Sequence, residues 1–308
     1  MMMNNDNRET LHYAIDYVEQ CENKMCSKYY AQRYSSRFLQ DMSMTLSICL
    51  AKGGNYNHFF YLTPENLKLK KLLNHRKQDF LSYSFDELLT DNIISLMTMG
   101  KSYVLVNLGF DNKEELQEIC FQDINFSYAF SLCNDVYFIA KKCHGGYKVF
   151  KIPKKNLIEL DLLDLNISRE FFKNILNNLY KDSLNDTANL NLNNALNNKF
   201  GELKRQSEIK LINDTGKSYW GIMGFCNDHF SDVYLVYRAY KLYDLKKQML
   251  KYLLSKYNDM LQRLGDKYEF QGKIENGPLI DVSDEDLQKL FSGLINCKQF
   301  IDMLTWQT

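Results

Sequence analysis

The sequence predicts an α+β fold that is rich in helix, with a small antiparallel meander and long helices. Three observations carry this prediction. A capped helix runs directly into a strand between Ser84 and Leu108, short runs of period two follow up to Asp161, and segment 231–264 contains no glycine or proline. With 308 residues and 45% hydrophobic side chains, the chain can bury the core of one large domain or of two modest ones.

The stretch from 84 to 108 has a clear predicted start and end. Ser84, followed three positions later by Glu87, has the spacing of a capping box, which satisfies free amides at the start of a helix. Gly100 stands where a left-handed residue ends a helix, and 103–106 is β-branched and aromatic enough for a strand. Residues at three- and four-residue steps predict one apolar face: Phe85, Leu88, Leu89, Ile93, Leu96 and Met97.

Helical spacing also marks the chain before this stretch. Residues 8–50 keep that spacing until the sequence KGGN at 52–55 interrupts it. A second start signal follows, with Thr63 as the N-cap and Pro64 at the first helical position, where its missing amide costs nothing. We expect this second helix to run to about Lys77.

After the 84–108 stretch, apolar and polar residues alternate in short runs. The segment His144–Gly146 lies between two of these runs and predicts a hairpin turn. We therefore expect a small antiparallel meander, half covered by the preceding helices. Its strands are predicted at 124–130, 136–140, 147–152 and 157–160.

The segment 231–264 predicts the longest helix, of about 50 Å at 1.5 Å per residue. Gly265 is placed to end it. Leu245, Met249 and Leu253 lie in the middle of its apolar stripe. Because long helices depend on tertiary contacts, we expect this stripe to pack against another long helix or a neighbouring subunit.

Three further segments complete the second half of the chain. A helix is predicted from Ser168, and the asparagine-rich segment 183–198 is expected to be the most mobile internal region, because asparagine side chains compete for backbone hydrogen bonds. A strand at 268–274 and an acid-capped helix at 283–296 are predicted near the end. The domain organisation then predicted is a helical and β-rich, wing-like region at 1–165, followed at 166–308 by a long-helix, stem-like region with a small β insertion and a C-terminal helix.

Composition bounds the classes of function. Thirty-eight basic residues balance thirty-eight acidic ones, so the chain as a whole lacks the charge of a nucleic-acid or membrane-surface binder, although a local patch is still possible. The first ten residues, MMMNNDNRET, do not resemble a signal peptide, and no apolar run of about 18 residues predicts a membrane span. We interpret the eight cysteines as thiols of a reducing compartment, and the frequent Asn, Lys and Tyr as the mark of an AT-rich genome, bacterial or phage.

Candidate nucleotide and metal motifs are weak. Two GKS tripeptides, at 100–102 and 216–218, lack the upstream glycine of a phosphate-binding loop, since Ser95 and Leu211 occupy that position. We therefore expect no ATP binding. Two Cys–His pairs, Cys143–His144 and Cys226 with His229, offer four zinc ligands, but nothing in the sequence links the pairs, and buried thiols and surface histidines explain them better.

Catalytic signatures are also lacking in the sequence. There is no G-x-S-x-G elbow and no H-E-x-x-H motif, and the carboxylates Glu159, Asp161 and Asp164 are interpreted as solvent-facing charge. The tyrosines and lysines of 234–257 suit base stacking, yet tyrosines at helical spacing are more often packing residues. We predict no catalytic residue, no cofactor and no metal.

One stretch resembles a known family. Leu88–Val106 reads LLTDNIISLMTMGKSYVLV, which is similar to the helix–glycine–strand pattern of tailed-bacteriophage portal proteins, and Leu69–Asn74 (LKKLLN) resembles the segment just before it. The strands of 124–160 are similar to the β-rich wing of that family. The helices predicted at 168–182 and 231–264 would correspond to its stem, with a small clip domain between them.

The resemblance implies a structural protein without chemistry of its own. Portal subunits form a homo-oligomeric ring of about a dozen copies at one capsid vertex, and double-stranded DNA passes through it during DNA packaging. Terminase and capsid or neck proteins would be the partners, with no membrane, and the protein would lie in the virion or in the cytoplasm of the bacterial host. Candidate channel residues are Lys199, Lys204 and Arg205.

Two other interpretations stay open. A different structural or interaction protein of phage or bacterial origin predicts a monomer or small oligomer with the long helix packed internally. An enzyme of unrecognised class predicts a concave pocket with convergent polar groups and shifted pKa values.

Overall fold

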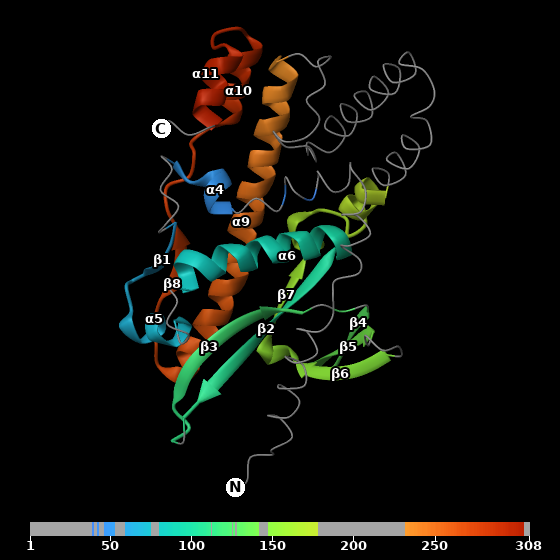
Figure 1. The fold of residues 1–308 in the computed structure, drawn as a ribbon, viewed down its shortest axis with the longest axis vertical. Coiled ribbons are helices and arrows are strands. Elements are labelled where there is room, and N and C mark those ends of the chain that lie inside the picture. Colours follow the sequence, from blue (N-terminus) through green and yellow to red (C-terminus); the bar gives the residue numbers. More distant parts are fainter. Residues whose placement is uncertain are drawn as a thin grey trace.

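The computed structural model describes residues 39, 42, 46–52, 59–74, 80–111, 113–124, 126, 128–141, 147–177 and 232–304. Within these ranges, helices and small antiparallel sheets are mixed along the chain (Figure 1). The predicted α+β class is therefore confirmed.

The helical elements, in chain order, are α4 (Leu46–Leu50), α5 (Leu67–Leu73), the π-helical turn η2 (Phe80–Ser84), α6 (Phe85–Met99), the 3₁₀ turns η3 (Lys154–Asn156) and η4 (Leu162–Leu165), α9 (Asp232–Tyr268), α10 (Asp284–Phe291) and α11 (Cys297–Leu304). The strands are β1 (Phe60–Thr63), β2 (Lys101–Phe110), β3 (Leu116–Asp123), β4 (Tyr128–Leu132), β5 (Asp135–Lys141), β6 (Tyr147–Pro153), β7 (Leu157–Asp161) and β8 (Lys273–Asn276).

The described strands form three antiparallel sheets, in the orders β3–β2–β7, β4–β5–β6 and β1–β8. The predicted antiparallel meander is confirmed for β4–β5–β6, but the fourth predicted strand, β7, does not belong to it, because β7 pairs with β2. Strand β2 has two partners, with Val104 opposite Asp123 on one side and Ile158 on the other. The sequence prediction also missed β3, which supplies one of these partners.

The middle sheet, β3–β2–β7, is buried on both faces. Val104 and Val106 point into the main core with α6 and α9, whereas Tyr103 and Leu105 point the opposite way into a second core shared with β4–β6. Alternate residues of one strand thus serve two cores, as the two-residue period of a strand requires. In Figure 1, α6 crosses one side of this sheet and β4–β6 lie beyond it.

The start of α6 differs from the prediction. Ser84 has helical backbone angles and its side chain makes no capping hydrogen bond. The chain enters α6 from the π-helical turn η2, so the extended conformation that a capping box needs is absent at Ser84. The predicted end is confirmed: Gly100 has φ 77° and its amide donates to the Leu96 carbonyl oxygen at 2.7 Å.

Helix α5 also starts later than predicted. Thr63 belongs to β1, where it lies opposite Lys273, so it cannot be the N-cap. The cap is Asn66, whose side chain accepts a hydrogen bond from the Leu69 amide at 3.0 Å. The helix ends at Leu73.

Helix α9 continues past the predicted stop at Gly265 and ends at Tyr268. The chain turns at Glu269, which has φ 58°, and Phe270 then folds back on the helix. A Cβ atom on Gly265 would collide with the Phe270 carbonyl oxygen. The glycine therefore permits a close backbone approach within the helix and does not end it.

The C-terminal region is tied to α9 and to the start of the described chain. Strand β8 pairs with β1, and Asn258 of α9 exchanges two hydrogen bonds with the backbone of Ile274. The strand predicted at 268–274 is thus displaced to Lys273–Asn276. Ser283 caps α10 in a capping box with Asp286, as the acidic start predicted, but α10 ends at Phe291 and α11 follows.

Candidate functional site

The family-like stretch, residues 88–106, folds into α6, Gly100 and the first half of β2. Helix α9 passes this unit and contacts α4, α6, β7 and β8. We call the region where α6, β2, β3, β7 and α9 meet the junction. Its polar side chains are the candidates for function, because buried polar groups need partners and are rarely incidental.

A chain of buried hydrogen bonds crosses the junction. The Tyr257 hydroxyl of α9 donates to Asn92 Oδ1 of α6 at 2.7 Å, and Asn92 Nδ2 donates to Asp123 Oδ1 of β3 at 3.1 Å. Two serines complete the shell of Asp123: Ser102 Oγ donates to Oδ1 at 3.0 Å and Ser95 Oγ donates to Oδ2 at 3.1 Å. One carboxylate thus joins three elements.

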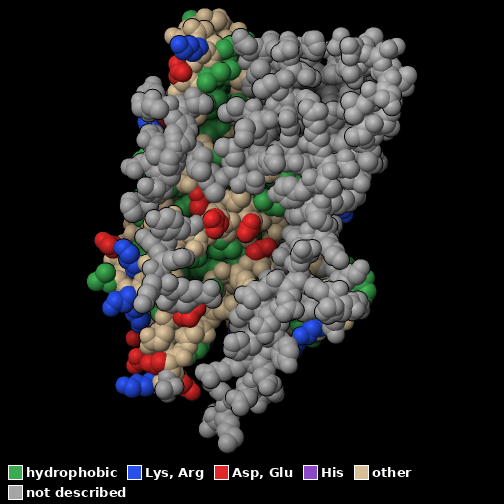
Figure 2. Space-filling view, in the orientation of Figure 1, with side chains coloured by type: hydrophobic (Ala, Val, Ile, Leu, Met, Phe, Trp, Pro, Cys, Tyr) green, Lys and Arg blue, Asp and Glu red, His purple; other side chains and the backbone are tan. Residues whose placement is uncertain are grey.

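Burial raises the pKa of Asp123 to about 6, although the hydrogen bonds from Ser102, Ser95 and Asn92 oppose that shift. The nearby Asp91 adds to the rise through charge repulsion. Acidic side chains gather over α6 in Figure 2. The pKa of Asp91, on the exposed side of α6, is itself raised by partial desolvation and by the charge of Glu87.

A second group of charges lies at the start of β2 and the end of β7. Lys101 pairs with Glu159, Arg169 pairs with Asp161, and Lys256 of α9 contacts Asp164 at 2.8 Å. Burial raises the pKa of Asp161, but hydrogen bonds from Arg169 and from the Leu163 amide outweigh it, so the net shift is downward. These groups are mutually neutralised.

Tyr252 of α9 links this charged group to the backbone. Its hydroxyl accepts a hydrogen bond from the Asp161 amide at 2.8 Å and donates to Asp164 Oδ2 at 3.0 Å. The interpretation of Asp161 as solvent-facing charge is wrong, because its side chain is buried against Arg169. The spacing of alternate carboxylates did not reveal that α9 and Arg169 cover this strand end.

The polar groups of the junction make contacts between helices and strands. A raised carboxyl pKa is typical of catalytic acids, but Asp123 accepts three hydrogen bonds from α6 and β2. Within the ranges that the structure describes, no group of three or more His, Cys, Asp or Glu side chains could hold a metal ion.

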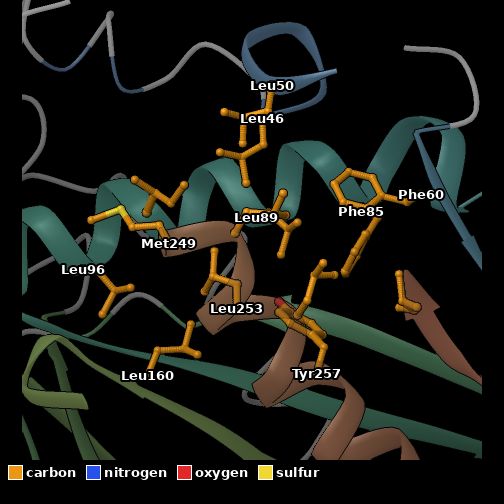
Figure 3. Packing of buried hydrophobic residues seen from close by; sticks show 14 of the residues in the cluster. Leu46, Leu50, Phe60, Phe85, Leu89, Leu96, Leu160, Met249, Leu253 and Tyr257 are labelled. Carbon is orange, nitrogen blue, oxygen red and sulfur yellow. The ribbon is translucent and has the colours of Figure 1, made fainter. Parts of the chain in front are cut away.

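The predicted stripe residues Leu245, Met249 and Leu253 are buried in the main core. Figure 3 shows Met249 and Leu253 among side chains from α4, α6 and β7, including Leu46, Leu89 and Leu160. The described part of the chain thus covers this stripe itself. Any contact with another subunit would use a different surface.

The first GKS tripeptide is divided among three roles. Gly100 ends α6, Lys101 pairs with Glu159, and Ser102 donates to Asp123. The other candidates lie outside the described residues: the second GKS tripeptide, both Cys–His pairs, segment 183–198, and the channel residues Lys199, Lys204 and Arg205.

Asp123 was missed at the sequence level, although a signal was present. Ile119, Phe121 and Asp123 alternate along one face of β3, so the carboxylate occupies the next core-facing position. Asn92 and Ser95 likewise interrupt the apolar face of α6. Polar residues at apolar positions on two neighbouring elements indicate a buried network.

No protein-family model matches the chain, and no curated protein matches its sequence. Of the helices that the structure describes, none combines the length and apolar character needed to cross a bilayer.

Proposed function

We propose that the protein is a structural subunit of a tailed-phage portal, a homo-oligomeric DNA-passage ring at a capsid vertex, without catalysis of its own. The observation that carries the proposal is the helix–glycine–strand unit, α6–Gly100–β2, which packs against α9, a single helix of 37 residues. In the family that this stretch resembles, such a unit belongs to the wing and the long helix to the stem.

The dimensions of α9 support this proposal. At 1.5 Å per residue, its length is about 55 Å. One end lies against the sheets and the other beside α10 and α11 (Figure 1). A helix that projects from a sheet-rich base suits a subunit that lines up with copies of itself around an axis.

The junction supports a structural role in a second way. It connects α9 to α6 through Tyr257 and Asn92, and to the end of β7 through Tyr252 and Asp161. These contacts, the first fully buried and the second partly buried, fix the angle between the long helix and the sheets. A ring needs that angle to be the same in every subunit, because small differences would prevent closure.

The mass of the particle in solution tests the proposal. Light scattering coupled to size exclusion, over a range of protein concentrations, should give a particle of about a dozen chains. Electron micrographs of the same fraction should show rings. A folded monomer or dimer at every concentration would overturn the portal function and favour the alternative of a different structural or interaction protein.

A further inference from the structure

The sheet β4–β5–β6 exposes a largely apolar outer face. Its inner face carries Val136, Phe138 and Phe150 of the second core. On the outer face, large apolar side chains remain in solvent: Tyr128 is 61% exposed, Phe130 40%, Leu132 58%, Tyr147 66% and Val149 58%. An antiparallel sheet with one open face normally places polar residues there. A cluster of this kind marks a binding surface.

Strand register brings the aromatic rings together on this outer face. Phe130 lies opposite Tyr137, and their rings are stacked, with centroids 5.2 Å apart and an interplanar angle of 8°. Tyr128, two positions before Phe130 on the same strand, has its ring centroid 6.3 Å from that of Phe130. Lys151 lies opposite Tyr137 on the other side, with Nζ 6.0 Å from the ring centroid.

This sheet is also locally basic. Residues 128–156 contain six lysines and a single acidic residue, Asp135, in a chain that has no net charge. Asp135 is paired with Lys151 at 2.9 Å. Lys154 and Lys155 are exposed on η3, which adjoins the β4–β5 turn because the Lys154 amide donates to the Asn134 carbonyl oxygen at 2.8 Å.

We propose that the outer face of β4–β5–β6 binds single-stranded nucleic acid, with unpaired bases stacked on Tyr128, Phe130 and Tyr147 and phosphates held by Lys151, Lys154 and Lys155. Exposed rings beside basic side chains are what sequence-tolerant single-strand binding requires. Duplex DNA hides the faces of its bases, so it offers such rings nothing to stack on. A second copy of the chain would bring like charges together, which disfavours self-association through this face. This proposal does not depend on the proposed portal ring.

Binding to the full chain can be followed by the fluorescence anisotropy of a labelled oligothymidine of about 20 nucleotides and of a duplex of equal length. We expect the single strand to bind more tightly than the duplex, with an affinity that falls as salt rises. Tyr128→Ala should weaken binding to the single strand about tenfold. Lys154→Glu should weaken it and reduce its salt dependence. Because both side chains are exposed, neither change should alter the urea unfolding midpoint.

Phe291→Ala is the matched control, since Phe291 is an aromatic residue of α10 that is 56% exposed and lies on a different surface. It should leave oligothymidine binding unchanged. Three results would overturn the proposal: no binding of the single strand at low salt, equal affinity for single strand and duplex, or equal losses for Tyr128→Ala and Phe291→Ala. A particle mass that falls in Tyr128→Ala, with no oligothymidine binding by the parent, would assign the face to protein contacts instead.

Discussion

The Tyr257 hydroxyl lies 2.7 Å from Asn92 Oδ1, although the two residues are 165 positions apart in the chain. Both side chains are buried, and the bond continues through Asn92 to Asp123. It therefore fixes the position of α9 along its axis relative to α6 and to the sheet. Apolar packing alone tolerates small shifts of a helix, whereas a buried hydrogen bond has one satisfactory geometry.

Tyr257→Phe removes this bond and keeps the ring. Asn92 Oδ1 then loses its donor in a fully buried site, so we expect a loss of about 1–2 kcal/mol in the free energy of unfolding. Urea unfolding measures the loss. The control is Tyr237→Phe on the same helix, whose hydroxyl makes no hydrogen bond within the described residues and whose change should cost little. Equal stabilities for the two variants would refute the role of the bond.

Asp123 should make stability increase as the pH falls from about 7 to about 4. The pKa of Asp123 is about 6 in the folded chain, against 3.8 when unperturbed. As the pH falls, the folded state therefore binds the proton at a higher pH than the unfolded state does. The gain in the free energy of unfolding is fully present below the unperturbed pKa of 3.8 and disappears as the pH rises through the folded-state pKa of about 6. Its upper limit is about 3 kcal/mol.

Asp123→Asn removes this titration and keeps the shape of the side chain. The difference between parent and variant in urea midpoint at pH 5 and pH 7 isolates the contribution of Asp123 from that of Asp161 and Asp164, whose lowered pKa values act in the opposite direction. An identical pH dependence in both proteins would mean that Asp123 titrates normally.

Gly100→Ala should be much more damaging than Gly293→Ala. Both glycines have a left-handed φ, 77° and 73°, so each alanine costs about 1 kcal/mol from backbone strain. A Cβ on Gly100 would also lie 2.6 Å from Arg169 Cβ, whereas nothing lies within 4 Å of a Cβ on Gly293. We expect a further loss of about 1–3 kcal/mol for Gly100→Ala in thermal unfolding. Similar melting temperatures for the two variants would show that Arg169 can move away.

Local signals in the sequence were sufficient for parts of this fold. Gly100 and Ser283 were placed correctly as the end of α6 and the cap of α10, since each depends on a few neighbouring residues. The strands β5, β6 and β7 were also found from their two-residue period. The exposed outer face was not foreseen, because alternation gives the two faces of a strand but not which face is covered.

Long-range contacts explain what the sequence did not predict. The pairing of β7 with β2 depends on residues more than 50 positions apart, and no local pattern distinguishes it from a meander. Gly265 is an exception, because the contact that requires glycine there is local: the chain turns at Glu269 and brings the Phe270 carbonyl back against the helix. Asp123 has its place in the hydrogen-bond network because α6 crosses the sheet and brings Ser95 beside it, and this is a tertiary contact. The boundary predicted near residue 165 stays a prediction.

Leu253→Asp should unfold the chain and not merely release folded subunits. Leu253 lies on the stripe of α9 and is fully buried within the described part of one chain, among side chains of α6 and β7 (Figure 3). A carboxylate there has no partner, and its cost of about 4–5 kcal/mol or more is close to the whole stability of an average domain. Circular dichroism and the urea midpoint report the loss. Ser255→Asp places the same charge on the exposed side of the same helix and should leave both unchanged. Folded Leu253→Asp monomers beside an assembled parent would instead place this stripe between subunits, and a variant as stable and as assembled as the parent would mean that the stripe is not buried at all.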